Sequence, residues 1–314
     1  MERYHLQQMQ SLPLEAKIVK SQQRIREWYS HWEGNVFVSV SGKDSTVLLH
    51  IARDIYPDIP AVFCDTGLEW PEVKAHIKTL NNVDWIRPKM SFKEIITTYG
   101  YPFPSKEQAR HIELYKNTKS ERVKKEKLEG VGPKKHFKIS EKWKFLLNAP
   151  FKVSNKCCDI LKIRPFNKYA KPTRKDIRRH PMMGVMAEES NSRRNKYLRY
   201  GCNAYDTRIP RSHPLGFWTE QDVLRFIKEN NISIPSIYGE VIEHGNGNLW
   251  LSGVQRTGCM YCLFGFQYDI GESKFEILKR EHPANYKYCM ETLNMKEVID
   301  HINSNIRYRE RIRY

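Results

Sequence analysis

Apolar runs of strand length alternate with stretches of helical periodicity over the first ninety residues. The run Val36–Val40 is β-branched and aromatic and ends at a Ser-Gly pair, which predicts a buried strand followed by a turn. Beyond the turn, apolar residues recur at helical spacing from Leu48 to Ile55, which predicts a helix that begins at Lys43. The flanking sequence continues the alternation, with helices expected at 14–33 and 72–80 and strands at 61–64 and 83–86. This order indicates an α/β fold, a Rossmann-like, mainly parallel sheet with helices on both faces.

The second half of the chain carries weaker patterns. The apolar run 181–187 predicts another buried strand. Residues 219–230 predict a helix in which Thr219 is the N-cap and Asp222 occupies the fourth position. Between the two halves, residues 105–148 carry thirteen Lys or Arg against six Glu, so we expect a basic, helical, solvent-facing insertion with a break at its Gly-Pro pair.

Charge makes a polyanionic partner a leading hypothesis. Among 314 residues, 53 Lys and Arg outnumber 36 Asp and Glu, and the net charge is +17. Such an excess is typical of proteins that meet nucleic acid, here tRNA or DNA, although solvated lysines give the same total. The insertion at 105–148 is therefore either a polyanion arm or an exposed helix pair. The C-terminal RYRERIRY suits either base stacking with phosphate neutralisation or a packed terminus.

The N-terminal segment predicts a cytoplasmic protein. It has charged and polar residues where a signal peptide needs an apolar core, and no later run approaches the ~18 apolar residues that span a bilayer. We therefore expect no membrane partner. In that compartment the seven cysteines are expected to be thiols or metal ligands rather than disulfides.

The turn after the first strand has the features of an anion site. Backbone N–H groups at Ser41 and Gly42 and at the helix start can hold phosphate oxygens, and Lys43 adds a cation. Asp44 is a candidate to orient Mg²⁺, and Ser45 is a candidate donor to a phosphate oxygen. Such a turn also joins strand and helix in α/β proteins without this chemistry.

A second loop is expected at the same edge of the sheet. Asp65, Thr66 and Gly67 follow the predicted strand 61–64. Because ligands of parallel sheets bind at the carboxyl ends of the strands, these three residues are candidate nucleotide contacts.

Four cysteines form two pairs. Cys157 and Cys158 are adjacent, and Cys259 and Cys262 form a C-x-x-C. Two such dithiols predict a four-thiolate site for a soft metal. Adjacent side chains diverge, which suits the separate iron corners of a [4Fe–4S] cluster better than a single tetrahedral zinc, so the cluster is expected and zinc is the alternative. Packed thiols in an apolar core are a third interpretation.

The three remaining cysteines have weaker signals. Cys64 ends a predicted buried strand and fits a packed thiol. Cys202 and Cys289 are each either a packed thiol, a substitute ligand or a reactive sulfur carrier.

Several ordered motifs together resemble the phosphoadenylyl-sulfate (PAPS) reductase family. The segment 41–45 is similar to the family's PP-loop, S-G-G-x-D-S, which is shared with ATP pyrophosphatases. Either Ser41 replaces the first Gly or the loop is one residue shorter. Further matches follow in the family's order over about residues 35 to 265, at 65–72, 157–162, 184–193, 213–223 and 256–262. The departures are Met186, where the family has Arg, and a longer separation between Cys158 and Cys259.

This resemblance implies an adenine-nucleotide α-hydrolase-like fold that binds ATP or PAPS. The nucleotide contacts it implies are Ser41, Gly42, Lys43, Asp44, Ser45, Asp65, Thr66, Gly67, Glu189, Ser190 and Arg193. The four paired cysteines resemble the [4Fe–4S] ligands of assimilatory adenylyl-sulfate reductases. We accordingly expect a helical lead-in at 1–34, a nucleotide-binding domain at 35–235 containing the basic insertion, and a helical region at 236–314 that completes the cluster.

Three functions fit these features. Sulfonucleotide reductases of the family end in a Glu-Cys-Gly whose thiol attacks the substrate sulfur, but here no Cys follows Cys289, so a reductase would need Cys289 or Cys202 as its nucleophile. The first expectation is therefore a PP-loop adenylating sulfurtransferase that acts on nucleic acid, with Lys43 and Asp44 catalytic and a sulfur-donor or redox protein as partner. The alternatives are a PAPS or adenylyl-sulfate reductase and a nucleotide-gated nucleic-acid-binding subunit.

Overall fold

The computed structural model describes residues 2–173, 177–245, 247–266 and 271–314. The chain folds into two compact units. Unit 1 comprises Met1–Asp65, Glu69–Arg87 and Pro165–Thr257, and unit 2 comprises Thr66–Leu68, Pro88–Arg164 and Gly258–Tyr314. The domain boundaries expected after residues 34 and 235 stay a prediction.

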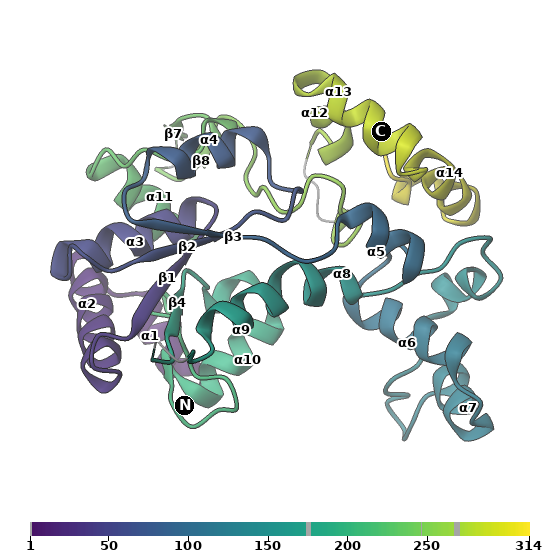
Figure 1. The fold of residues 1–314 in the computed structure, drawn as a ribbon, viewed down its shortest axis with the longest axis horizontal. Coiled ribbons are helices and arrows are strands. Elements are labelled where there is room, and N and C mark those ends of the chain that lie inside the picture. The colour runs from purple at the N-terminus through teal and green to yellow at the C-terminus, as the bar shows by residue number, and fades with distance from the viewer. Residues whose placement is uncertain (1, 174–176, 246, 267–270) are drawn as a thin grey trace. The chain divides into compact units, whose positions relative to one another are not determined.

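Unit 1 contains the predicted α/β sheet, which confirms the expected fold class (Figure 1). The sheet has six strands in the order β3-β2-β1-β4-β6-β5, and only the β5–β6 pair is antiparallel. Its strands are β1 Val36–Val40, β2 Ala61–Cys64, β3 Val83–Ile86, β4 His180–Met183, β5 Asn203–Ala204 and β6 Arg211–Ser212. Beside this sheet, β7 Val241–Glu243 and β8 Leu249–Leu251 form an antiparallel pair that the sequence patterns did not predict.

Helices cover both faces of the sheet. Phe37 of β1 packs against Phe166 of α9 (Arg164–Ala170), with ring centroids 6.3 Å apart. His180 of β4 stacks on Trp32, the residue after α2 (Leu14–His31), with centroids 3.4 Å apart. His180 is the register partner of Val36, and side chains of successive strand residues point to opposite faces. Phe37 follows Val36 directly, so the side chains of Phe37 and His180 point to opposite faces of the sheet. The helices they contact, α9 and α2, therefore cover opposite faces.

The other predicted elements of unit 1 form close to their expected positions. Two helices start at a recognisable signal, with Pro71 in the first turn of α4 and Thr219 as the N-cap of α11. The predicted helices are α3 Lys43–Ile55, α4 Pro71–Thr79 and α11 Glu220–Glu229; α1 Arg3–Gln10 lies in the expected helical lead-in, and α10 Asn191–Tyr200 was not predicted. The strand expected at 181–187 is shorter than predicted, because β4 ends at Met183 and a 3-10 turn forms at Ala187–Glu189.

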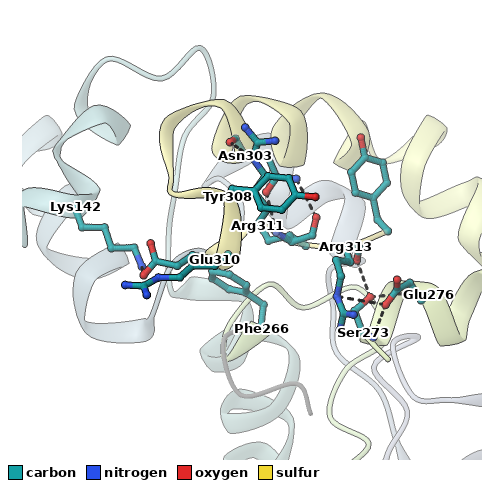
Figure 2. A pocket seen from close by; sticks show the side chains of 12 residues that line it. Lys142, Phe266, Ser273, Glu276, Asn303, Tyr308, Glu310, Arg311 and Arg313 are labelled. Carbon is teal, nitrogen blue, oxygen red and sulfur yellow. Dashed lines mark hydrogen bonds and ion pairs between the residues drawn. The ribbon is translucent and has the colours of Figure 1, made fainter. Parts of the chain in front are cut away.

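Unit 2 is largely helical. The basic insertion forms α6 Lys106–Asn117 and α7 Glu121–Glu129, as the charge pattern predicted. The other helices are α5 Phe92–Thr98, α8 Lys156–Cys158, α12 Lys274–Glu281, α13 Pro283–Lys287 and α14 Met295–Asn305. The last residues of the chain run past α12 and α14 and line a cavity of about 900 Å³ (Figure 2). In the described parts of both units, no helix is both long and apolar enough to cross a membrane.

Candidate nucleotide site and cysteine cluster

The predicted loop Ser41–Ser45 joins β1 to α3, and its own side chains hold it in shape. The Ser45 hydroxyl accepts a hydrogen bond from the Ser41 N–H at 2.8 Å and donates one to the Gly42 carbonyl at 2.8 Å. Thr46 donates a second bond to the same carbonyl at 3.2 Å. The Ser45 hydroxyl is therefore engaged with the loop backbone, and the first turn of α3 is fixed relative to the strand.

A second close approach fixes the loop from the neighbouring strand. Gly184 follows β4, and a Cβ there would overlap the backbone of Asp44 and Ser45 at 2.7–2.8 Å. Real Cβ atoms do not approach backbone so closely, so only glycine fits. The predicted apolar run 181–187 therefore brings its glycine directly against the start of α3.

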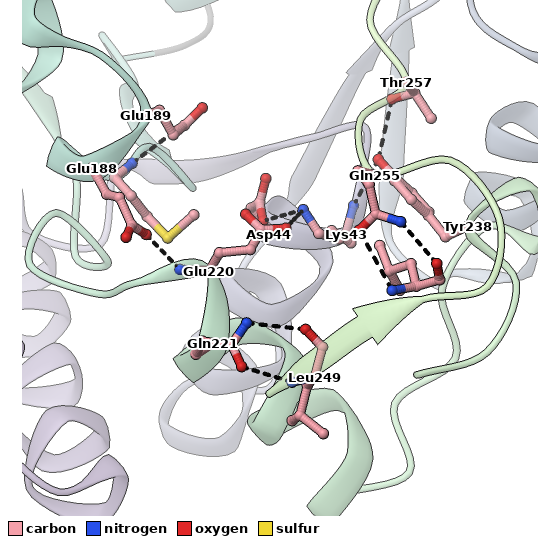
Figure 3. Close-up of polar contacts among 12 residues, drawn as sticks. Lys43, Asp44, Glu188, Glu189, Glu220, Gln221, Tyr238, Leu249, Gln255 and Thr257 are labelled. Atoms are coloured by element: carbon pink, nitrogen blue, oxygen red, sulfur yellow. Dashed lines mark hydrogen bonds and ion pairs between the residues drawn. The ribbon is translucent and has the colours of Figure 1, made fainter. Parts of the chain in front are cut away.

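Lys43 is a buried cation (Figure 3). Its side chain is 2% exposed, and its ammonium lies 3.1 Å from an Asp44 oxygen and 2.8 Å from a Glu220 oxygen. Burial alone lowers the pKa of Lys43, but the charges of Asp44 and Glu220 outweigh it, so the net pKa is raised. Lys43 is therefore charged at neutral pH and held at the anion-binding turn.

Tyr238 closes the other side of the turn. It lies in a 3-10 turn at Ser236–Tyr238, and its hydroxyl accepts a hydrogen bond from the Lys43 backbone N–H at 3.4 Å. The Thr257 hydroxyl is 3.1 Å from the same oxygen. A Cβ on Gly42 would overlap this hydroxyl. Burial raises the pKa of Tyr238, so the phenol stays neutral and can occupy the position of an anion's oxygen at this N–H.

Glu189, Ser190 and Arg193 start the neighbouring helix α10. Ser190 is its N-cap and accepts a hydrogen bond from the Arg193 N–H at 3.2 Å. The Glu189 carboxylate accepts one from the Met186 N–H at 2.9 Å and is ion-paired with Arg193. Glu188 accepts a hydrogen bond from the Glu220 N–H at 2.7 Å, which ties this segment to the start of α11.

Two guanidinium groups add positive charge near Asp44. Burial lowers the pKa of Arg193, the charge of Arg256 lowers it further, and the charge of Asp44 raises it. Each of these effects requires proximity, so Arg193, Arg256 and Asp44 share one electrostatic environment. Asp44 and Glu220 pair with Lys43, and Glu189 pairs with Arg193, so a nucleotide's phosphate chain would compete with these carboxylates for the cations.

The second predicted loop is divided between the two units. Asp65, in unit 1, is ion-paired with Lys74 at 2.7 Å and Arg87 at 3.3 Å. Thr66 and Gly67 belong to unit 2, where the Thr66 hydroxyl accepts a hydrogen bond from the Leu68 N–H at 3.2 Å. Asp65 is thus a second acidic group surrounded by cations in unit 1.

The four paired cysteines all lie in unit 2 and influence one another. The sulfurs of Cys157 and Cys158 are 4.0 Å apart. Their hydrogen bond raises the pKa of Cys157, as do burial and the charges of Cys158, Cys262 and Cys259. The same hydrogen bond lowers the pKa of Cys158, and the charges of Lys106 and Lys162 lower it further.

Four thiols are suitable ligands for a thiophilic metal, but their side chains are not arranged around a common metal position. Within the described ranges, no three His, Cys, Asp or Glu side chains are placed so that they could hold a metal ion. Four soft sulfur donors from two segments of one unit nevertheless match an iron–sulfur cluster or zinc in chemistry. The cluster therefore remains a prediction from the sequence.

The other two candidate thiols are buried. Burial raises the pKa of Cys202 to about 12 and that of Cys289 to about 12. Cys202 lies in unit 1 and Cys289 in unit 2. A thiol with such a pKa is almost entirely protonated at neutral pH and is a weak nucleophile in this conformation.

Sequence reasoning missed three residues of the site in unit 1. Glu220 was expected only as part of a helix start and Arg256 only as the first residue of the motif at 256–262, while Tyr238 carried no pattern of its own. Tyr238 lies 195 positions from Lys43 in the chain. A signal was available for Glu220, because an acidic residue in the first turn of a helix at a ligand-binding edge suits a cationic neighbour.

A parallel α/β sheet with a cation-lined turn at the end of its central strand defines a nucleotide-binding class of protein. The family model described as the phosphoadenosine phosphosulfate reductase domain matches residues 35–130 and 85–263. The chain belongs to this family. A comparison with curated protein sequences gives no match. Among solved structures, phosphoadenylyl-sulfate (PAPS) reductase from Candida auris, in a phosphate complex, is similar at 13% identity with a TM-score of 0.39, over 75% of this chain and 90% of that one.

Proposed function

We propose that this chain is an ATP-using PP-loop enzyme that adenylates a group on a nucleic acid and so prepares it for sulfur incorporation. The loop Ser41–Ser45 would hold the phosphates of ATP, with Mg²⁺ near Asp44. The observation that carries the proposal is the buried, charged Lys43 at this loop, held by Asp44 and Glu220. A desolvated cation is well suited to stabilise charge that develops on departing pyrophosphate.

The chemistry of this step is a transfer of AMP. An oxygen of the nucleic-acid group attacks the α-phosphorus of ATP, a new P–O bond forms, and the bond to the β-phosphate oxygen breaks. Pyrophosphate leaves with the electron pair. Lys43 and the guanidinium groups of Arg193 and Arg256 offset its charge, and the backbone N–H groups of the loop orient it.

The buried thiols favour this reaction over sulfonucleotide reduction. A reductase needs a thiolate that attacks the substrate sulfur. Cys202 and Cys289 each have a pKa raised to about 12 by burial, which suits packing better than attack. Reduction of PAPS or adenylyl sulfate to sulfite is the second candidate, because the family model that matches the chain is that of the reductase domain.

We also propose that Cys157, Cys158, Cys259 and Cys262 bind a [4Fe–4S] cluster, with zinc as the alternative metal. The support is the donor chemistry and the mutual influence of the thiols on their pKa values. A bound cluster would offer a site for carrying sulfur or electrons delivered by a partner protein. Lys106 and Lys162, whose charges favour the Cys158 thiolate, would keep that ligand deprotonated.

One parallel assay tests the proposed reaction. Pyrophosphate release from ATP is measured with and without RNA or DNA, beside sulfite release from PAPS with a dithiol. We expect nucleic-acid-stimulated pyrophosphate release that falls about 100-fold in Lys43→Met. The control Lys78→Met removes an exposed lysine from α4 in the same unit and should leave the rate unchanged.

Two outcomes would contradict adenylation. Sulfite release without pyrophosphate release would establish the reductase instead. Salt-sensitive nucleic-acid binding without turnover of either nucleotide would indicate a nucleotide-gated binding subunit.

A further inference from the structure

The C-terminal segment of unit 2 forms a 3-10 turn at Tyr308–Glu310 and continues in extended backbone at Arg311, and its side chains alternate between two environments. Residues 310, 312 and 314 face the unit: Glu310 is ion-paired with Lys142 at 2.8 Å, Ile312 is buried, and Tyr314 is hydrogen-bonded to Asp300. The residue before each of them, Arg309, Arg311 and Arg313, is exposed. The alternation in RERIRY therefore puts one apolar or paired side chain inside for every arginine outside.

Backbone contacts hold this segment in place. The side chain of Asn303, on α14, accepts a hydrogen bond from the Ile312 N–H at 2.8 Å and donates one to the Ile312 carbonyl at 2.9 Å. The Ser273 hydroxyl, at the start of α12, donates to the Arg313 carbonyl at 2.6 Å. The arginines are thus presented from a fixed backbone, which lowers the entropy lost when they bind a ligand.

The segment forms one wall of the 900 Å³ cavity (Figure 2). Its lining has an excess of positive charge, because four basic side chains outnumber two carboxylates, on Glu276 and Glu310, which are ion-paired with Arg313 and Lys142. The basic side chains that line it are Lys142, Arg309, Arg311 and Arg313. The cavity is therefore an open, cationic groove suited to a polyanion.

Tyr308 identifies the kind of polyanion. It lines the groove, its side chain is 83% exposed, and the guanidinium of Arg311 lies 5.2 Å from its ring centroid. Within the fold the ring gains the cation–π contact with Arg311, worth about 0.5–1 kcal/mol at an exposed site, and otherwise remains in water. The same ring is suited to stacking on an unpaired base, whereas an acidic peptide would use only the charges.

We propose that this groove binds single-stranded nucleic acid, with a base stacked on Tyr308 and successive phosphates on Arg309 and Arg311. Arg309 lies in the 3-10 turn at Tyr308–Glu310 and Arg311 follows it directly, so two exposed guanidinium groups close together in the chain can contact neighbouring phosphates of one strand. The inference rests on the proposed function for its biological role, since it gives the nucleic-acid substrate a place of contact, but the binding itself requires no turnover.

Fluorescence anisotropy with labelled oligothymidylate and oligouridylate of about 15 nucleotides tests the site across a salt series. We expect Arg309→Gln/Arg311→Gln to weaken binding about tenfold or more and to reduce the slope of log K against log salt by roughly 1.4. Tyr308→Ala should weaken it by about 5- to 100-fold, and Tyr308→Phe should restore it, because a phenyl ring still stacks. Thermal unfolding checks that each variant is folded.

The matched control is Lys124→Gln/Lys125→Gln on α7, which removes the same charge from the basic insertion of the same unit. Equal losses in the two double variants would show that binding follows total charge and would overturn the site. Tighter binding of a duplex of the same length, or equal displacement by polyglutamate, would overturn the single-stranded specificity.

A separate measurement distinguishes this inference from the proposed reaction. If the wild-type protein binds the strands through Tyr308 but releases no pyrophosphate, adenylation is refuted and the proposed binding groove is not. If Arg309→Gln/Arg311→Gln binds the strands as tightly as the wild type, and nucleic acid stimulates pyrophosphate release equally in both, the proposed groove is refuted and adenylation is not.

Discussion

The hydroxyl of Tyr238 accepts a hydrogen bond from the backbone N–H of Lys43, 195 positions earlier in the chain. This N–H is one of the donors that a phosphate would use at the start of α3. The same hydroxyl fills the space above Gly42, where a Cβ would meet it. One phenol oxygen therefore both occupies an anion-binding donor and explains why residue 42 is glycine.

This relationship predicts that a substitution at Gly42 can be rescued at Tyr238. Gly42→Ala should destabilise unit 1 by about 1–3 kcal/mol, because its Cβ overlaps the phenol oxygen. Gly42 has a φ of −96°, so alanine suffers no backbone strain there. Tyr238→Phe removes the oxygen, and the next ring atom lies 3.6 Å away, at ordinary contact distance. Urea unfolding of the single and double variants measures the rescue.

Gly184→Ala is the control for this rescue. Its Cβ would meet backbone atoms of Asp44 and Ser45, which no side-chain substitution can remove. Tyr238→Phe should therefore leave the cost of Gly184→Ala unchanged. If Tyr238→Phe relieved both alanine variants equally, or neither, the contact between Gly42 and Tyr238 would not be the cause.

Tyr238→Phe should also raise the affinity of the loop for nucleotide. In the wild type, a phosphate must displace the phenol from the Lys43 N–H, and a hydrogen bond contributes about 0.5–1.5 kcal/mol net. Removing it should tighten the binding of a non-hydrolysable ATP analogue by about 2- to 12-fold, measured by calorimetry. Weaker binding would mean that the phenol is itself a ligand of the nucleotide.

The fold could be predicted because its strongest signals are local. The strands Val36–Val40, Ala61–Cys64 and Val83–Ile86 form at their predicted bounds, since short apolar runs between turn residues have few alternatives. The strand predicted over 181–187 ends at Met183, because the next residue, Gly184, packs closely against Asp44 instead of continuing the sheet. Such a tertiary contact leaves no periodic pattern in the sequence.

The site was harder to predict than the fold, because its parts are distant in sequence. The motif at 41–45 marked the turn, but the partners of Lys43 come from α11 and from the 3-10 turn at Ser236–Tyr238. A single Tyr or Glu has no spacing that reveals a partner nearly 200 residues away. Local chemistry thus located the anion site, while its supporting residues required tertiary structure.

A buried ion pair joins α2 to α11 and predicts an asymmetric response to mutation. Lys17 is 2% exposed and lies 2.6 Å from Asp222, which also caps α11 through the Thr219 N–H. Asp222→Asn leaves a buried cation without its counter-charge and should cost about 3–5 kcal/mol. Lys17→Met leaves Asp222 with its capping bonds and should cost less, about 1–3 kcal/mol.

Urea unfolding and a double-mutant cycle measure this difference. The double variant Lys17→Met/Asp222→Asn should be more stable than additivity predicts, by about 1–3 kcal/mol. The exposed pair Lys228–Glu243, with atoms also 2.6 Å apart, is the control, and Lys228→Met should cost less than about 1 kcal/mol. Equal costs for Lys17→Met and Asp222→Asn would contradict the assigned asymmetry.

The cysteine proposal predicts a metal content that depends on particular thiols. Protein purified without oxygen should contain about four iron and four acid-labile sulfide per chain. Cys259→Ser should lose most of this content, because a serine hydroxyl is a poor ligand for a soft metal. Cys64→Ala, in the buried strand β2, should retain it. A colourless protein with one zinc per chain would decide for the alternative metal.

His180 predicts a loss of stability on acidification. Its ring stacks on Trp32, and burial, assisted by the charges of Arg178 and His31, lowers its pKa from 6.5 to about 4. Below pH 6.5 the unfolded chain takes up a proton that the folded chain binds only near pH 4. The contribution of His180 is therefore complete above pH 6.5, and on the order of 2–3 kcal/mol of it should be lost as the pH falls towards 4.

Urea unfolding between pH 4.5 and 7.5, a range chosen to bracket roughly this titration, measures the loss. His180→Phe keeps an aromatic ring against Trp32 but cannot be protonated, so its stability should depend less on pH between the two pKa values. His50 lies on the exposed side of α3, and His50→Gln should leave the wild-type curve unchanged. If His180→Phe lost as much stability on acidification as the wild type, the acid sensitivity would have to come from another group, and the stack on Trp32 would contribute packing alone.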